Sequence, residues 1–358
     1  MSEASLTWPS LLNRLVARND LTAEDTAWAM DEMMSGRATP TQIGAFAVAL
    51  RAKGETAGEV AGMAEVMLAH ARRVTLDRPA VDVVGTGGDQ AGTVNISTMS
   101  ALVTAAAGVP VVKHGNRAAS SRCGTADVLE KLGVAIELSP ESVTKSVQEL
   151  GIGFCFAPAF HPALRHVGPS RAQLGIPTTF NVLGPLTNPA QPTSALVGVA
   201  NERMAPIIAD VLAARGFSVL VVHGDDGLDE ITTTTTTTAW VVSGGTVRTE
   251  KIDPSALSIA RSGAHDLAGG DAEKNATVVR ALAAGQAGPV RDTVLLNAAG
   301  AIAAFRGLSD DLHADLAAAM ETATEAVESG RVADLLERWV PLSAALRDED
   351  AGVAGVAG

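Results

Sequence analysis

From Pro79 onward, short apolar runs alternate with segments of helical periodicity, and this alternation limits the folds open to the chain. The apolar run at residues 81–84 stops at Gly85, and helical spacing resumes over residues 97–107. A strand is expected next at 109–113, and a helix at 126–132. Further strands are expected at 152–156, 195–200, 218–223 and 239–242, and further helices at 202–215, 271–285 and 293–304. Such alternation is typical of an α/β domain with a mainly parallel sheet.

The first 72 residues show helical periodicity and no strand signal. Apolar side chains recur at helical spacing near Leu11, a second helix is expected after Thr22, a third at Thr39-Pro40 and a fourth over 56–70. We therefore predict a small helical domain at residues 1–76 and a large α/β domain at 77–358. Part of the proline-rich segment 165–192 is expected to add to the hinge on the helical side. The threonine run 232–238 is expected to form a strand, and the tail 348–358 to be loose.

Composition excludes several classes of protein. Hydrophobic residues make up 47% of the chain and charged residues 19%, which is a globular composition and argues against a disordered chain. The formal net charge of −13 opposes binding to nucleic acid or to an anionic membrane over a broad surface. Two cysteines, Cys123 and Cys155, are too few for a disulfide framework, and no apolar run is long enough to span a bilayer. The N-terminus does not look like a signal peptide, so we expect a cytoplasmic protein.

A glycine-rich turn follows the first expected strand. The sequence GTGGD at residues 85–89 precedes Thr93 and the polar NIST segment at 95–98. Glycine lets the backbone approach an anion closely, and N–H groups at a helix start can bind phosphate. The turn matches neither the dinucleotide fingerprint nor the P-loop, and an ordinary tight turn is the alternative. The polar residues that follow favour a phosphate site.

A basic loop follows the next expected strand. Lys113, Arg117 and Arg122 lie within ten positions of one another, together with several hydroxyl side chains. Cations and hydroxyls together suit a polyphosphate, and such a concentration in an acidic chain argues against a merely solvated loop. For His114, a neutral structural role is favoured over that of a general base.

Two further groups of charged residues are candidates for a site. Asp229 and Glu230 follow the apolar run at 219–222 and could hold Mg²⁺, although acidic loops are usually only solvated. Arg171 lies in the proline-rich segment and could bind a carboxylate with two hydrogen bonds, although it could equally be a surface arginine.

Four motifs, in this order, carry a resemblance to a known family. They are GTGGD with NIST, KHGNRAASSRCGTADVLEKLG, HPALRHVGPSRAQLGIPTTFNVLGPLTNP and GLDE. Their order and spacing closely resemble those of anthranilate phosphoribosyltransferases, over essentially the whole chain. The resemblance implies a pentosyltransferase of L-tryptophan biosynthesis from chorismate, at its second step. This enzyme transfers the phosphoribosyl group of phosphoribosyl pyrophosphate (PRPP) to the amine of anthranilate and releases pyrophosphate. The resemblance also implies an active site between a helical and an α/β domain, and a homodimer joined through the helical domain. It further implies that each active site binds two Mg²⁺ ions.

The resemblance assigns roles to individual residues. The PRPP pocket is expected to comprise Gly85, Thr86, Gly88, Asp89, Thr93, Asn95, Ile96, Ser97, Thr98, Lys113, His114, Gly115, Asn116, Arg117, Ala118, Ala119, Ser120, Ser121 and Thr125. The metal ligands are expected to be Ser97, Asp229 and Glu230, and the anthranilate contacts Gly85, Asn116 and Arg171. Lys113, His114, Asn116 and Arg171 are the expected catalytic residues.

Two alternatives remain open from the sequence. A pyrimidine nucleoside phosphorylase resembles this family in fold, but it uses inorganic phosphate and would not need the GLDE metal pair. A non-catalytic relative that binds nucleic acid would need an extended basic surface, which the net charge of −13 opposes. For the transferase, we expect catalysis by orientation and electrostatics, without a covalent intermediate or an obligatory base.

Overall fold

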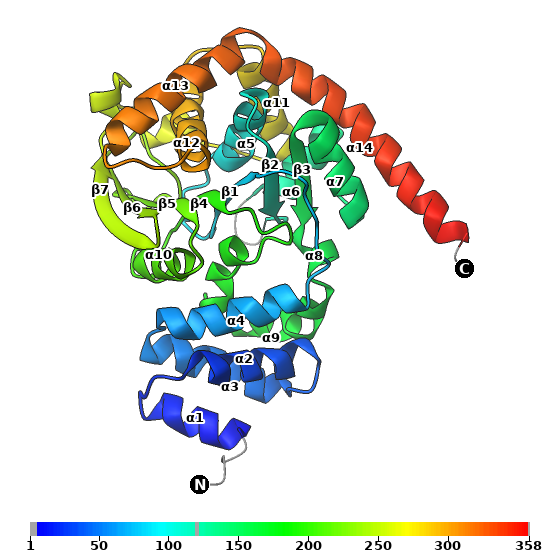
Figure 1. Ribbon diagram of the computed structural model, residues 1–358, viewed down its shortest axis with the longest axis vertical. Coiled ribbons are helices and arrows are strands. Elements are labelled where there is room, and N and C mark those ends of the chain that lie inside the picture. Colours follow the sequence, from blue (N-terminus) through cyan, green and yellow to red (C-terminus); the bar gives the residue numbers. More distant parts are fainter. Residues whose placement is uncertain (1–5, 119–121, 357–358) are drawn as a thin grey trace.

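The computed structural model describes residues 6–118 and 122–356 and contains one seven-stranded sheet (Figure 1). The strand order is β3-β2-β1-β4-β5-β6-β7. The strands are β1 Val81–Gly85, β2 Val111–Gly115, β3 Ile152–Phe156, β4 Ser194–Gly198, β5 Ser218–Gly224, β6 Thr237–Ser243 and β7 Thr246–Ile252. Strands β1 to β5 run parallel, and β6 and β7 are antiparallel. The prediction of an α/β fold with a mainly parallel sheet is confirmed.

In the described part of the chain, four helices precede the sheet and pack together at one end of the molecule (Figure 1). They are α1 Trp8–Val16, α2 Ala23–Met34, α3 Pro40–Lys53 and α4 Ala57–Ala69. Thr22, Thr39 and Thr56 each accept a backbone hydrogen bond at a helix start, and the side chain three residues later accepts one from the threonine amide. These reciprocal caps satisfy N–H groups that a helix start leaves unpaired, which explains why the helices begin there.

Further helices follow the first strand. They are α5 Ile96–Ala106, α6 Thr125–Leu132, α7 Pro140–Leu150, α8 Ala157–Phe160, α9 Gly168–Leu174, α10 Met204–Ala214, α11 Ala272–Ala283, α12 Pro289–Arg306, α13 Leu312–Glu328 and α14 Arg331–Val356. Short 3₁₀ turns lie at η1 Pro162–His166, η2 Thr179–Val182, η3 Gly184–Leu186, η4 Pro254–Leu257 and η5 Ala264–Leu267. None of the described helices is long and apolar enough to cross a membrane.

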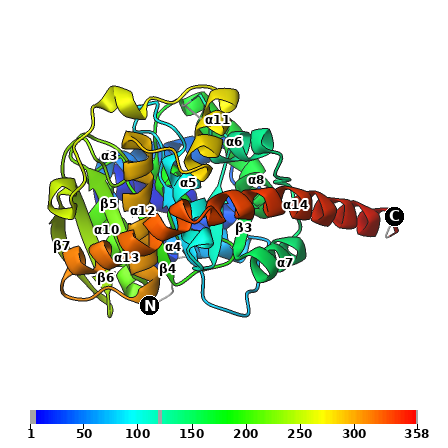
Figure 2. The same ribbon diagram turned by 90° about the horizontal axis from the view of Figure 1, so that it is seen from above.

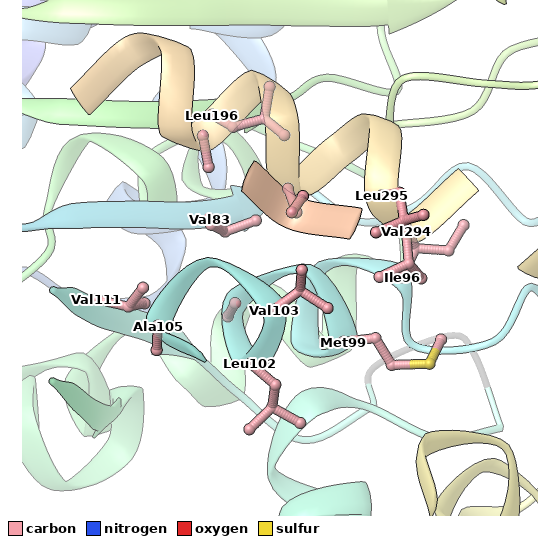
Figure 3. Packing of buried hydrophobic residues seen from close by; sticks show 14 of the residues in the cluster. Val83, Ile96, Met99, Leu102, Val103, Ala105, Val111, Leu196, Val294 and Leu295 are labelled. Carbon is pink, nitrogen blue, oxygen red and sulfur yellow. The ribbon is translucent and has the colours of Figure 1, made fainter. Parts of the chain in front are cut away.

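Helices cover both faces of the sheet, and successive side chains of a strand point to opposite faces. Val83 and Leu196 pack in one cluster with α5 and α12, as Figure 3 shows. The next residues, Val84 and Val197, belong to a second cluster that contains α10 and the helical bundle. The helical bundle and one face of the sheet therefore share a continuous apolar core.

The segment between β3 and β4 returns toward the helical bundle. The turn η1 contacts α2, and α9 contacts α3 at the end of the molecule where the bundle lies (Figure 1). Leu174 of α9 lies beside Gly44 of α3, where an added Cβ would be 3.9 Å from its Cδ2. Residues of the proline-rich segment thus pack on the bundle, although they follow three strands of the sheet. The boundary at residue 76 stays a prediction.

The structure corrects the expectation for the C-terminal tail. Residues 348–356 continue α14, which projects beyond the body of the molecule (Figure 2). Asp350 accepts hydrogen bonds from the Ser139 amide (2.7 Å) and the Ser142 hydroxyl (2.8 Å) at the start of α7. These contacts hold the helix against α7, and the sequence of the tail gives no sign of them.

The expectation for the threonine run is wrong over most of its length. Only Thr237 and Thr238 belong to β6, whereas residues 232–236 form a connection stabilised by side-chain hydrogen bonds. Threonine has high β propensity, but its hydroxyl can also bond to nearby polar groups, and here that second property decides the conformation.

Candidate active site

The carboxyl ends of the central strands meet where the strand order changes direction. The chain leaves β1 for β2 and β3 on one side, and later adds β4 and β5 on the other. In open parallel sheets, ligands bind outside the carboxyl ends of the strands at such a point. The glycine-rich turn follows β1, the basic loop follows β2, and Asp229 and Glu230 follow β5. The topology therefore brings three of the predicted motifs to one edge.

Two glycines make room for Asp229. Gly85 of β1 and Gly198 of β4 are register partners at the ends of their strands. A Cβ at Gly198 would overlap the carbonyl oxygen of Asp229, and one at Gly85 would overlap its carboxylate. The loop after β5 can therefore cross these strand ends only because both positions lack a side chain.

The two carboxylates are held by backbone amides of the motifs opposite them. The Gly87 amide donates to Asp229 Oδ2 at 2.7 Å, and the Ser97 amide, at the start of α5, donates to Glu230 Oε1 at 3.1 Å. Burial raises the pKa of Asp229 to about 8, and the charge of Asp89 adds to the rise. Burial, and then the charge of Asp229, also raises the pKa of Glu230 well above its ordinary value. The site thus disfavours two bare negative charges and would be relieved by a cation.

The donor set fits a hard divalent cation. Asp229, Glu230 and the Ser97 hydroxyl offer oxygen atoms only, which is the preference of Mg²⁺. Within residues 6–118 and 122–356, no group of three or more His, Cys, Asp or Glu side chains could hold a metal ion. A cation here would therefore need oxygen ligands from water or a bound phosphate, as Mg²⁺ commonly has.

Lys113 places a buried amino group beside the carboxylates. Its side chain is only 4% exposed, and Nζ donates to the Val83 carbonyl and, at 3.2 Å, to Ser97 Oγ. Burial lowers the pKa of Lys113, while the charges of Asp82, Glu230 and Asp229 oppose this shift. The two hydrogen bonds of Nζ fix the end of the Lys113 side chain under the start of α5.

His114 lies on the opposite side of β2 because side chains alternate along a strand. Its Nδ1 lies 3.1 Å from the Gly184 carbonyl oxygen, and its ring is 5.1 Å from that of His161. Burial, and then the charge His161 would carry if protonated, lowers the pKa of His114 to about 3. The imidazole is therefore neutral near pH 7 and too weakly basic to accept a proton readily.

Arg117 and Ala118 of the basic loop contact α6. Arg117 forms ion pairs with Asp127 (3.2 Å) and Glu130, and its guanidinium lies over the Phe156 ring. The amide of Ala118 donates to Asp127 at 3.0 Å. Arg117 therefore bonds to helix α6 rather than facing the carboxylates. Ala119, Ser120 and Ser121 lie outside the described residues.

The other predicted residues of these loops differ from one another in exposure and in the groups that they contact. Asn116 is exposed, and its Oδ1 accepts from the Arg117 amide at 2.7 Å. Thr98 Oγ1 donates to Thr125 Oγ1 at 3.3 Å, which joins α5 to the start of α6. Ile96 has its side chain in the core, so it can offer a ligand only its main chain. Gly115 lies against the Phe154 ring, 2.9 Å from where its Cβ would be.

The glycine-rich turn is shaped by backbone geometry. Gly88 has a φ of +88°, which other residues rarely adopt. The Thr86 amide donates to the Gly198 carbonyl at 2.9 Å, and its hydroxyl accepts from the Ala200 amide at 3.1 Å. Asp89 Oδ1 accepts from the Ala91 amide at 3.2 Å. The turn is therefore attached to β4 at Thr86 and to Asp229 at Gly87, and it is bonded within itself at Asp89.

Arg171 has no acidic partner within the described chain. It lies on α9, half-buried, with its guanidinium 5.4 Å from the centre of the Phe180 ring. Burial lowers its pKa, and no ion pair in residues 6–118 and 122–356 involves it. A half-buried guanidinium without a carboxylate is suited to bind one from outside.

Comparison with known proteins decides the family. The model for the glycosyl transferase family, a/b domain, matches residues 77–333, and that for the helical bundle domain matches 9–71. The anthranilate phosphoribosyltransferase of Saccharopolyspora erythraea is 64% identical over 342 residues, covering 96% of this chain and 97% of the relative. That of Mycobacterium leprae is 55% identical, covering 94% of each.

The chain belongs to the anthranilate phosphoribosyltransferase family.

Solved structures of anthranilate phosphoribosyltransferases agree with this assignment. The structure from Thermus thermophilus has a TM-score of 0.85 at 40% identity and covers 93% of this chain and 99% of its own. A Saccharomyces cerevisiae structure in complex with PRPP and Mg has a TM-score of 0.85 at 27% identity, covering 96% and 99%. The family inferred from four motifs is therefore confirmed.

Some residues that stabilise the candidate site of this chain were not predicted from the sequence. Asn95 donates to the Cys123 carbonyl (3.1 Å) and accepts from Asn275 (2.8 Å), and Thr93 bridges to Ala268. The segment 267–275 thus closes the polar stretch before α5. Asn275 is 180 residues from Asn95 in the sequence, and it stands in no motif that could have identified it. Gly198 was missed for the same reason.

Proposed function

We propose that this chain transfers the 5-phosphoribosyl group of PRPP to the amine of anthranilate, giving N-(5-phosphoribosyl)anthranilate and pyrophosphate. It would act as a pentosyltransferase at the second step of tryptophan biosynthesis. The observation that carries this proposal is the meeting of a glycine-rich turn, a helix start and a buried carboxylate pair at one sheet edge. In a family member at 64% identity to a named transferase, that edge is the natural site for a phosphorylated sugar.

We propose Asp229, Glu230 and Ser97 as the ligands of Mg²⁺, with two ions per active site. The yeast relative binds PRPP and Mg together, and the oxygen donors here fit the same cation. When bound, Mg²⁺ would neutralise charge on the pyrophosphate as that group leaves. The raised pKa values of both carboxylates support this role, because a bound cation would compensate the charge that burial disfavours.

The residues around the turn are proposed to bind PRPP. The backbone of residues 85–88, Asp89, Thr93 and residues 95–98 would hold the sugar and its phosphates, together with Thr125. The basic loop at residues 113–121 would close over the phosphates. The Lys113 ammonium would attract the leaving group more strongly as the C1–O bond breaks and negative charge grows on pyrophosphate, which lowers the barrier.

Anthranilate is proposed to lie with its carboxylate against Arg171. Its ring would lie between Arg171 and the end of strand β1. Gly85 and Asn116 would complete the contact. The amine lone pair forms the new bond to C1, the C1–O electron pair leaves with pyrophosphate, and the nitrogen then loses a proton to water. The anthranilate amine is neutral near pH 7, so orientation matters more than deprotonation, and a His114 with a pKa of about 3 fits a mechanism without an obligatory base.

The molecule is proposed to be a cytoplasmic homodimer joined through the helical domain of residues 1–76. Two large apolar side chains of the bundle support this contact. Val16 is 76% exposed at the end of α1 and Val48 is 39% exposed on α3, which packs against α1. Apolar surface of this kind is stabilised when a second copy covers it.

The test of the function is the loss of anthranilate fluorescence on incubation with PRPP and Mg²⁺. We expect loss only when both are present, and none after the metal is removed with EDTA. A parallel assay follows release of base from a pyrimidine nucleoside with inorganic phosphate, where we expect no turnover. Phosphorolysis without anthranilate consumption would overturn the proposal in favour of a nucleoside phosphorylase.

A further inference from the structure

The threonine run 232–238 follows the loop that presents Asp229 and Glu230. Its hydroxyls bond to the two acidic residues that precede that loop, Asp225 and Asp226. The segment at residues 225–234 therefore folds back on itself, with the carboxylate pair at its middle. A seven-residue threonine tract is unusual, and these contacts give it a structural purpose.

One set of contacts fixes the chain before Asp229. Asp226 Oδ1 accepts from the Leu228 amide at 3.2 Å, and the Gly224 amide donates to the Leu228 carbonyl at 2.9 Å. Asp226 Oδ2 in turn accepts from the Thr232 hydroxyl at 2.7 Å and from the Thr234 hydroxyl. The Asp226 side chain thus links the residue before the carboxylate pair to the residues after it.

A second set fixes the chain after Glu230. Asn297, fully buried on α12, accepts from the Ile231 amide through Oδ1 and donates to the Ile231 carbonyl through Nδ2, both at 2.8 Å. One turn away on the same helix, Thr293 bonds to the Thr233 hydroxyl at 2.7 Å. Gly300 leaves space for Ile231, whose Cδ1 would lie 2.9 Å from an added Cβ. A single face of α12 therefore holds residues 231–233.

We propose that Asp226, Thr232 and Asn297 are positioning residues that hold the Asp229 and Glu230 carboxylates in the geometry needed to bind the divalent cation of PRPP. This inference rests on the proposed function and adds three residues outside the predicted site. Partners that orient metal ligands are typically worth about 10- to 100-fold in metal affinity or activity. A loop held on both sides keeps the Asp229 and Glu230 side chains together without the cation.

The experiment compares isosteric variants of two threonines in the same run. Thr232→Val removes the hydroxyl that bonds to Asp226 and keeps the buried volume, while Thr232→Ser keeps the hydroxyl. Thr236→Val is the matched control, because its hydroxyl bonds to Asp225, which Lys251 (2.7 Å) and Thr238 (3.0 Å) also hold. Mn²⁺ binding in the presence of PRPP is measured by electron paramagnetic resonance, and KM for anthranilate and thermal unfolding are measured alongside.

We expect Thr232→Val to weaken PRPP-dependent Mn²⁺ binding by about tenfold or more, with KM for anthranilate little changed. Thr232→Ser should restore most of the binding, and Thr236→Val should bind Mn²⁺ like the wild type. Asn297→Ser, which shortens the side chain on α12, should weaken Mn²⁺ binding as well. If both Thr232→Val and Asn297→Ser fold and bind Mn²⁺ as the wild type does, the positioning role is wrong. Failure of the wild type to bind Mn²⁺ with PRPP would instead contradict the proposed function.

Discussion

At the scale of single residues, two absent side chains decide where the carboxylates can lie. Asp229 passes over the ends of β1 and β4 at Gly85 and Gly198, and each glycine leaves the space that Asp229 occupies. The sequence identifies Gly85, because it stands in a glycine-rich motif. It does not identify Gly198, because a lone glycine at a strand end has many explanations, and only the sheet register brings it under Asp229.

Alanine at either glycine should displace Asp229. Gly198→Ala should lower the free energy of unfolding by about 1–3 kcal/mol, because the new Cβ would overlap main-chain atoms that cannot turn aside. Gly85→Ala should lower activity more than stability, since its Cβ meets the carboxylate itself. Urea unfolding and the fluorescence assay measure both effects. Gly58→Ala is the control: it lies in α4 with open space around it, so it should be neutral or stabilising by up to about 1 kcal/mol.

His114 should make the protein less stable in acid. Its pKa is about 3 in the folded protein and near 6.5 when exposed, so below about pH 6.5 the unfolded chain binds a proton that the folded chain refuses. Stability should therefore fall as the pH drops from about 6.5 toward 4, by up to about 1.4 kcal/mol per pH unit for this group. In His114→Asn, urea midpoints should fall less steeply over that range. The control is the same replacement at the exposed His265, which should leave the dependence of the urea midpoint on pH as in the wild type. If His114→Asn also leaves that dependence unchanged, the lowered pKa of His114 is contradicted.

At the scale of elements, local patterns predicted much of the fold. The four N-terminal helices and the central strands were predicted because their caps, glycine stops and periodicity are local signals. Strand β7, a polar strand at the edge of the sheet, was not assigned from the sequence, and neither were helices α7, α8, α9, α13 and α14. The end of α14 and the threonine run were predicted wrongly, because side-chain hydrogen bonds decide both, with a distant partner for α14 and near partners for the threonines. Asp350 contacts a helix start more than 200 residues earlier in the chain, and the threonines bond to aspartates.

The end of α14 should contribute to stability through Asp350. Asp350→Ala removes two hydrogen bonds to the start of α7 and should lower the free energy of unfolding by about 1 kcal/mol or slightly more. Activity should stay unchanged, because this contact lies on α7 and α14. Asp348→Ala is the matched control, since its ion pair with neighbouring Arg347 is exposed and worth little. Equal unfolding midpoints for the two variants would show that the Asp350 contacts do not stabilise the fold.

At the scale of the whole molecule, one apolar core joins the helical bundle to the sheet. The cluster that contains Leu11 and Phe46 also contains Val84 and Val197, beside the strand ends that form the site. The segment from η1 to η3 adds to this arrangement, because it bears Arg171 on the bundle side and contacts His114 of β2 through Gly184. The position of Arg171 relative to Asp229 and Glu230 thus depends on packing between distant parts of the chain. Local sequence patterns carry no information about that packing.

The bundle surface should decide the oligomeric state. Val48→Glu places a charge on an exposed apolar position of α3 and should shift sedimentation from dimer to monomer. Val353→Glu, on the exposed end of α14, should leave the sedimentation coefficient unchanged. A wild-type chain that sediments as a monomer would contradict the proposed dimer, and a dimer that persists in Val48→Glu would place its interface elsewhere.

The most direct test of the central claim is a crystal structure of the wild-type protein with PRPP and Mg²⁺. The account predicts pyrophosphate density against the backbone of residues 85–88 and the start of α5. It also predicts a cation about 2.1 Å from oxygen atoms of Asp229 and Glu230. Density for PRPP away from these residues, or a cation held only by other side chains, would contradict it.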